Sequence, residues 1–139
     1  MANVTRDVTA SIDAASAMYA TQLSDGLTAG VDLPACSPCF VDNNGLVQLC
    51  DGTALDAKVI VDGINARKAK AGEAVTLFGV GTKFSISAAP LSTTIRILYL
   101  SATAGEWADA ATTGDAKGTA RVINTATHQV CVLLRGNVQ

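Results

Sequence analysis

Two cysteines separated by two residues, Cys36 and Cys39, have the spacing in this chain best suited to chemistry. Such a pair can form a redox-active disulfide, ligate zinc or pack as two thiols. Redox catalysis needs the first cysteine at a helix N-terminus, where the helix dipole lowers the thiol pKa. Here a strand pattern and an Asn-Gly turn follow the pair instead, so the sequence disfavours a redox site.

A zinc site needs four ligands, which could come from Cys36, Cys39, Cys50 and either Cys131 or His128. The second pair lacks the compact spacing that makes a zinc ribbon convincing. We therefore expect structural cysteines, buried as thiols or oxidised after cell lysis, and no metal or cofactor.

The remaining candidate groups have simpler explanations than catalysis. His128, the only histidine, falls in a stretch that reads as the turn between the last two strands, where a solvated side chain is expected rather than a general base. The stretch 79–83, Gly-Val-Gly-Thr-Lys, lacks the full phosphate-loop spacing and a following helix, so we interpret it as a β-turn. Asp51, Asp56 and Asp62 lack calcium-loop spacing and read as solvated turn carboxylates.

Charge is scarce along the whole chain. Charged residues make up 16% of the sequence, against roughly 25% in an ordinary soluble domain. The only glutamates are Glu73 and Glu106, so the chain has too few of these residues to form the exposed charged helices of typical cytosolic enzymes. This composition favours a protein that works through surface and shape, and we do not expect an enzyme.

The charge balance also narrows the choice of partners. The net charge is −2, and the ten basic residues are scattered from Arg6 to Arg135 without forming a stripe that could neutralise phosphates. No stretch approaches the ~18 uncharged apolar residues of a spanning helix, and the first residues do not resemble a secretion signal. We expect neither a nucleic-acid nor a membrane partner, and synthesis in the cytoplasm of a cell.

Residues 1–30 differ in composition from the rest of the chain. They carry Ala, Ser, Thr and Asp with sparse large apolar residues, and they cannot form a core alone. Helical spacing and an extended conformation are both compatible with this segment, so we expect an N-terminal arm, extended or as a short helix. A frayed terminus is the alternative. Because arms dock through sparse apolar anchors, the candidate contacts are Val8, Ile12, Met18 and Tyr19.

From residue 31 to residue 139 the pattern is typical of β-structure. The clearest feature is Asp-Asn-Asn-Gly at 42–45 between two apolar runs, which predicts a hairpin because Asn and Gly tolerate positive φ. Around Trp107, expected to be a packing anchor, residues 103–109 leave room for a short helical turn or loop. The other strands are expected over 58–61, 74–78, 83–87, 95–100, 120–123 and 130–135. The sequence therefore predicts an all-β fold, a compact barrel or sandwich of about eight short strands preceded by the arm.

Several stretches of this β-rich part resemble phage head decoration proteins, also called capsid cement proteins. Residues 29–36 and 40–47 resemble that family's opening strands. Residues 71–77 resemble its A-G-E-x-V-x-V/L segment, and residues 98–105 its Y-L-S-x-x-x-G segment. Its closing strand pair is similar to 121–123 with 130–134. The order and spacing of these stretches carry the resemblance, whereas Cys36 and Cys39 have no place in the family pattern.

The resemblance implies a small β-rich domain, commonly trimeric, on the outer surface of a tailed-phage head. Such a domain binds the major capsid protein and braces neighbouring capsid subunits against internal DNA pressure, without catalytic residues. The family often uses an N-terminal extension to reach onto the lattice, which is the role implied for residues 1–30.

Composition favours association with other protein subunits independently of the resemblance. An apolar, charge-poor β domain exposes apolar surface and unpaired strand edges, and symmetric oligomerisation would bury both. A receptor- or carbohydrate-binding β module on the virion surface is the main alternative. Such sites usually expose aromatic rings, and aromatic residues are only 4% of this chain. A small metalloprotein or redox enzyme is the third possibility.

Overall fold

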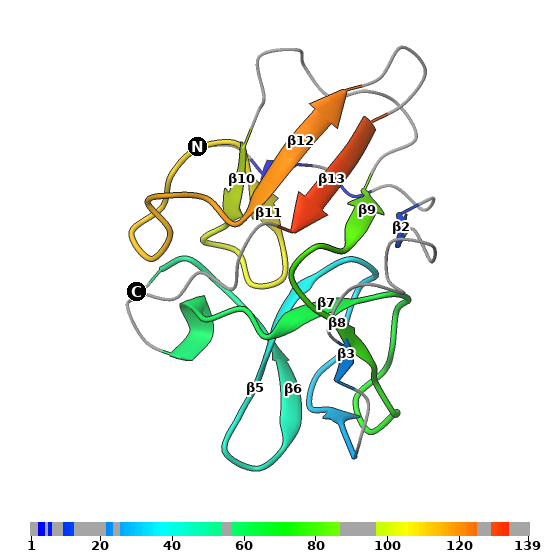
Figure 1. The fold of residues 1–139 in the computed structure, drawn as a ribbon. Helices are drawn as coiled ribbons and strands as arrows, with labels where there is room; N and C mark the ends of the chain where they lie inside the picture. The colour runs from blue at the N-terminus through cyan, green and yellow to red at the C-terminus, as the bar shows by residue number, and fades with distance from the viewer. Residues whose placement is uncertain are drawn as a thin grey trace.

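The computed structural model of this chain describes residues 3–4, 6, 10–12, 22–23, 26–53, 57–86, 97–124 and 129–133. Within these ranges the chain forms short strands and one 3-10 turn, η1 (Ala57–Val59). The strands belong to two sheets that stack on each other, one in the upper and one in the lower half of Figure 1. The predicted all-β fold is confirmed, in the form of a compact sandwich.

The upper sheet has seven strands drawn from both ends of the chain. Its strands are β1 (Asn3–Val4), β2 (Ser11–Ile12), β9 (Lys83–Ser85), β10 (Ile97–Leu100), β11 (Trp107–Ala108), β12 (Ala120–Asn124) and β13 (Gln129–Leu133). They lie in the order β1-β11-β10-β12-β13-β9-β2, and every pair is antiparallel. The longest ladder of hydrogen-bonded pairs in this sheet joins β12 to β13.

The lower sheet has six strands. They are β3 (Gln22–Leu23), β4 (Thr28–Ala29), β5 (Pro38–Val41), β6 (Leu46–Leu49), β7 (Gly63–Asn65) and β8 (Leu77–Phe78), in the order β3-β8-β7-β5-β6-β4. All pairs are antiparallel except β4 with β6, which is parallel.

The predicted hairpin is confirmed as β5–β6, although its turn differs from the expected one. Gly45 has φ +78°, while Asn44 stays out of the left-handed region. The Gly45 N–H donates to Asp42 O at 3.1 Å, and the Asp42 N–H donates to Leu46 O at 2.9 Å. The loop is therefore a β-turn followed by a left-handed glycine, which adds one residue to the two-residue Asn-Gly turn.

Two local expectations, one of a strand and one of a helical turn or loop, are wrong in detail. Residues 58–61, expected as a strand, begin inside η1, although Val59 and Val61 are buried and Ile60 between them is exposed. Buried and exposed side chains thus alternate here although these residues form no strand. Residues 103–109, expected as a helical turn or loop, contain β11, because Trp107 and Ala108 pair with both β1 and β10.

The core lies in two clusters on opposite sides of the six-stranded sheet. The larger cluster fills the space between the sheets and consists of Val4, Cys36, Cys50, Val59, Val61, Ile64, Phe84, Ile86, Leu98, Leu100, Trp107, Ala120, Val122, Cys131 and Leu133. The smaller one consists of Ala29, Leu33, Cys39, Val47, Val75 and Leu77. Trp107 is 1% exposed, which confirms its role as a packing anchor.

The described parts of residues 1–30 include strands of both sheets. Val4 in β1 is buried in the larger cluster, and Ile12 in β2 packs against it. Val8, Met18 and Tyr19 lie outside the described residues. The role of Ile12 as a capsid contact stays a prediction. Part of its side chain packs against the domain's own core.

Candidate functional site

The four cysteines are buried, and none of them forms a disulfide. Burial raises the pKa of Cys36 and of Cys39 to about 12, and it also raises the pKa of Cys50. A thiol held protonated in this way is a poor nucleophile at neutral pH. The prediction that these cysteines are buried is confirmed.

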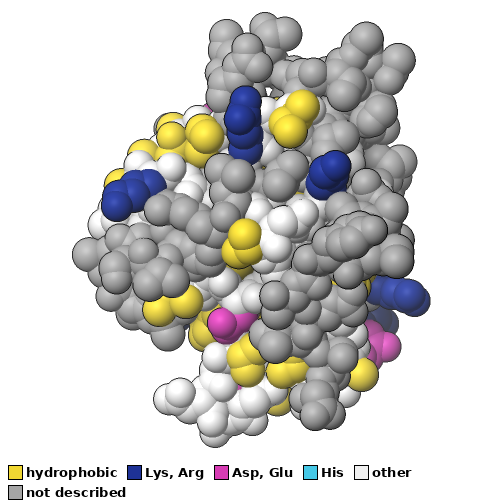
Figure 2. Space-filling model, viewed as in Figure 1, with side chains coloured by type: hydrophobic (Ala, Val, Ile, Leu, Met, Phe, Trp, Pro, Cys, Tyr) yellow, Lys and Arg dark blue, Asp and Glu magenta, His cyan; other side chains and the backbone are white. Residues whose placement is uncertain are grey.

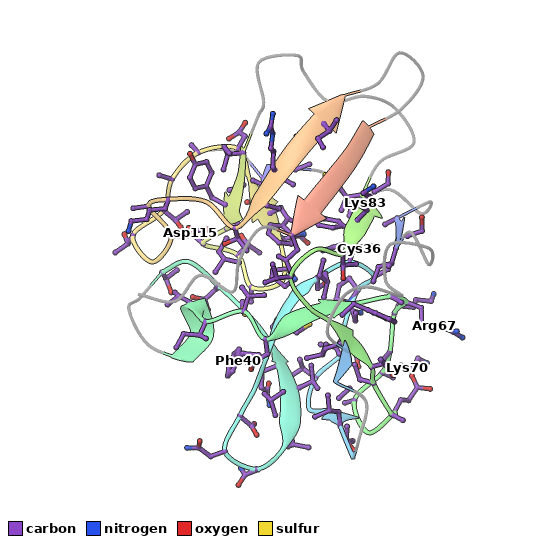
Figure 3. The ribbon with its side chains drawn as sticks, viewed as in Figure 1. Cys36, Phe40, Arg67, Lys70, Lys83 and Asp115 are labelled. Atoms are coloured by element: carbon purple, nitrogen blue, oxygen red, sulfur yellow. The ribbon has the colours of Figure 1, made fainter. Side chains whose placement is uncertain are left out.

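The backbone at Cys36 separates the two cysteines of the pair. Cys36 has φ +57°, a left-handed conformation that is uncommon for a side-chain-bearing residue. Its N–H donates to Asn65 O at 3.0 Å, and Figure 3 places Cys36 between the two sheets. Cys39 belongs instead to the smaller cluster, where its Sγ donates to Ser37 O at 3.3 Å. The two thiols therefore serve different cores.

Two of the other predicted sites, residues 79–83 and Asp51, lie in turns. Thr82 N–H donates to Gly79 O at 3.2 Å and Gly81 has φ +99°, so the interpretation of 79–83 as containing a β-turn is confirmed. The Asp51 carboxylate accepts from its neighbour Thr53. His128 and Asp56 lie outside the described residues. Over the described ranges, no three His, Cys, Asp or Glu side chains are placed to hold a metal ion.

Asp115 is a buried carboxylate that the sequence did not single out. It accepts hydrogen bonds from the Leu100 N–H at 2.9 Å, the Gly118 N–H at 2.8 Å and the Thr119 Oγ1 at 2.8 Å. These donors come from β10 and from the loop that leads into β12. Because all three bonds are internal, Asp115 holds this loop on the sheet rather than presenting a reactive group.

The surface of the seven-stranded sheet that points away from the larger core cluster is a candidate docking face. We define this outer face by Ile97 and Tyr99 of β10 with Arg121 and Ile123 of β12, which alternate with the buried residues of the same strands. Ile123 is 44% exposed and Arg121 is exposed, while Ile97 and Tyr99 are half-buried. Figure 2 views the molecule from this side and shows hydrophobic and basic side chains near one another over the upper sheet.

The register extends the basic character of this face. Ile97 pairs with Arg121, Arg121 with Val132, and Val132 with Lys83, so these residues occupy one row across four strands. Lys83 is exposed at the far end of the row. The outer face thus combines apolar side chains with two cations, and its row holds no acidic residue.

A second feature is a cleft of about 780 Å³ between the end of β1 and two turns of the lower half. Arg6, Arg67, Lys68 and Glu106 line it. Sequence reasoning missed this site because Arg6 and Arg67 are far apart along the chain. The local run at 66–70, Ala-Arg-Lys-Ala-Lys, was the one available signal.

No protein-family model, curated protein or solved structure matches the chain. The resemblance to decoration proteins therefore depends on the stretches quoted above and stays a prediction. In the ranges that the structure describes, no helix is long and apolar enough to cross a membrane.

Proposed function

We propose that this chain is a structural cement protein that binds the outer surface of a phage head and stabilises contacts between major capsid subunits. The observation that carries the proposal is the outer face, where apolar side chains lie beside cations on a sheet. Among the described residues, no further layer of strands covers this face. Exposed apolar area of this kind marks interaction surfaces on folded proteins.

The chemistry of the outer face suits a particular partner surface. Arg121 and Lys83 favour an acidic surface, and Ile123 favours an apolar contact next to it. Each such contact is weak when solvated. Repetition over a lattice, and association of the chain as a homotrimer, would multiply these contacts into firm attachment.

The stretches that resemble decoration proteins occupy turn-and-strand units, which agrees with the proposal. Residues 71–77 form a turn, with Gly72 at φ +94°, that leads into β8. Residues 98–105 leave β10 and end at Gly105, which has φ +79°. Glycine is needed at both positions because other residues rarely adopt this backbone conformation.

Co-sedimentation with assembled phage heads that lack the protein tests the proposal. We expect saturable binding of the wild-type chain, and at least a tenfold loss of affinity for Ile123→Glu. Ile60→Glu is the matched control, because Ile60 is 40% exposed but lies after η1, away from the outer face. The proposal is overturned if the wild-type chain does not bind heads and does not raise their survival of heat or osmotic shock. Equal losses of affinity for the two variants would show that the outer face is not the contact with the head.

The alternative of a carbohydrate-binding module receives less support. Sugar sites usually present an exposed ring, and none of the described aromatic side chains is exposed. Trp107 and Phe84 are buried, while Phe40, Phe78 and Tyr99 are half-buried.

A further inference from the structure

The cleft next to β1 has the size and the lining of a ligand site. Its volume of about 780 Å³ falls within the ~300–1,000 Å³ typical of clefts that take small ligands. Val4, Pro34 and three alanines supply apolar wall, and charged side chains supply the rest. A cleft of this kind accepts a ligand with both a charged and an apolar part.

The charge of the lining is opposite to that of the chain. Arg6, Arg67 and Lys68 stand against the single carboxylate of Glu106, which leaves two positive charges in excess, whereas the whole chain carries −2. Arg6 is paired with Glu106, at 3.2 Å. Arg67 and Lys68 are exposed and have no carboxylate partner among the described residues; Figure 3 shows Arg67 projecting from the side of the molecule beyond β7.

Asn65 holds two walls of the cleft in place. This side chain is buried, and its Nδ2 donates to Pro34 O at 2.8 Å and to Arg67 O at 2.9 Å. Its Oδ1 accepts from the Ser37 N–H at 2.9 Å. One amide thus ties the turn before β5 to the turn after β7, so the cleft exists before any ligand arrives.

Arg6 ties in the remaining wall. Its Nη2 donates to Gly105 O at 2.7 Å and to Ser37 Oγ at 3.2 Å, while Nη1 bonds to Glu106. The Arg6 side chain is only 14% exposed. Its charge is therefore fixed in position and compensated by Glu106, so the excess positive charge of the cleft lies at Arg67 and Lys68.

We propose that this cleft binds a carboxylate-bearing ligand with a short apolar body. The carboxylate lies at Arg67 and Lys68, and the apolar body lies against Val4 and Pro34. The ligand is either a small organic acid or the carboxylate end of a peptide. This site is separate from the outer face and does not depend on the proposed cement function.

Backbone amide chemical shifts of the folded protein provide the test. The probes are N-acetyl-Ala-Ala with a free carboxylate, its amide-capped twin, and propionate. We expect the free carboxylate peptide to give saturable shifts at residues 35–36 and 66–69, and the capped twin to bind at least tenfold more weakly. If propionate matches the peptide, the ligand source is a small acid; if only the peptide binds, the source is a peptide end.

Variants then assign the site to its cations. Arg67→Ala combined with Lys68→Ala removes exposed side chains without touching the core, and we expect about a tenfold loss of affinity. Lys70→Ala is the matched control, because Lys70 is an exposed lysine two residues further along that does not line the cleft. Equal binding of the capped twin, or unchanged affinity of the double variant, overturns the inference. Since no phage head enters this assay, neither result bears on the cement proposal.

Discussion

The indole Nε1 of Trp107 donates a hydrogen bond to the Cys36 carbonyl at 2.9 Å. The bond runs from β11 of the upper sheet to the turn that precedes β5 of the lower sheet. The Trp107 ring also stacks on Phe84, with 5.5 Å between ring centroids. A single side chain thus joins the two layers and supports the left-handed backbone at Cys36.

Replacing Trp107 by Phe should destabilise the fold strongly. The smaller ring leaves a cavity and leaves the Cys36 carbonyl without its buried partner, which together cost about 2–4 kcal/mol. Urea unfolding followed by circular dichroism measures the change, with a lower midpoint and an unchanged slope. Tyr99→Phe is the control, because it removes a polar atom from a half-buried ring and should change stability by less than about 0.5 kcal/mol. Similar effects of both substitutions would contradict the role given to Trp107.

The native thiols should resist modification. Cys36, Cys39, Cys50 and Cys131 are buried, so Ellman's reagent should label none of them within minutes and all of them in denaturant. Ala102→Cys, which adds a cysteine at an exposed position after β10, should react at once and confirms that the reagent is active. Rapid native labelling of Cys36 and Cys39 would instead revive the redox interpretation of the pair.

Burial of these thiols also predicts a loss of stability in alkali. In the unfolded chain Cys39 releases its proton near its ordinary pKa of 9.0, whereas burial raises the folded pKa to about 12. The contribution of the buried thiol to the free energy of unfolding is therefore complete below pH 9. It declines as the pH rises from 9 toward 12, by up to about 1.4 kcal/mol per pH unit for each thiol. Urea unfolding at pH 7, 9 and 10 measures this slope, and Cys39→Ala should make it shallower. A slope that the substitution leaves unchanged would show that other groups cause the alkaline loss.

Alternating apolar residues were sufficient to predict the class of the fold and most of its longer strands. The turn at 42–45 marked the hairpin because its composition permits few other conformations. The same alternation misled at Val59 and Val61, since a 3-10 turn followed by extended chain buries them as well as a strand would. Trp107 was recognised as an anchor, but its strand is too short to leave a periodic signal.

Local sequence patterns could not predict the cleft or the separation of Cys36 from Cys39. Arg6 meets Glu106 only because β1 adds to the edge of β11, a pairing between distant segments that the sequence order does not reveal. Cys36 and Cys39 are close in sequence, yet a left-handed residue sends them to different clusters. Burial of Asp115 likewise depends on a loop folding back over β10. Each of these features follows from tertiary contacts rather than from residue type or spacing.

A pair of glycine substitutions separates backbone strain from steric clash. Gly45 and Gly105 have nearly the same φ, +78° and +79°. A Cβ on Gly45 would meet nothing within 4 Å, whereas a Cβ on Gly105 would lie 2.9 Å from both Cδ atoms of Leu49. We expect Gly45→Ala to cost about 1–2 kcal/mol for the left-handed backbone, and Gly105→Ala to cost a further ~1–3 kcal/mol for overpacking.

The free energies of unfolding of the two variants measure this difference, and a double variant identifies its source. Combining Gly105→Ala with Leu49→Ala removes the clashing side chain, so the pair should be less destabilising than the sum of the single changes. Gly45→Ala combined with Leu49→Ala should be additive, because a Cβ at Gly45 has no such contact. Equal costs at the two glycines, or additive behaviour at both, would show that Leu49 moves aside at little cost and that no clash adds to the backbone strain.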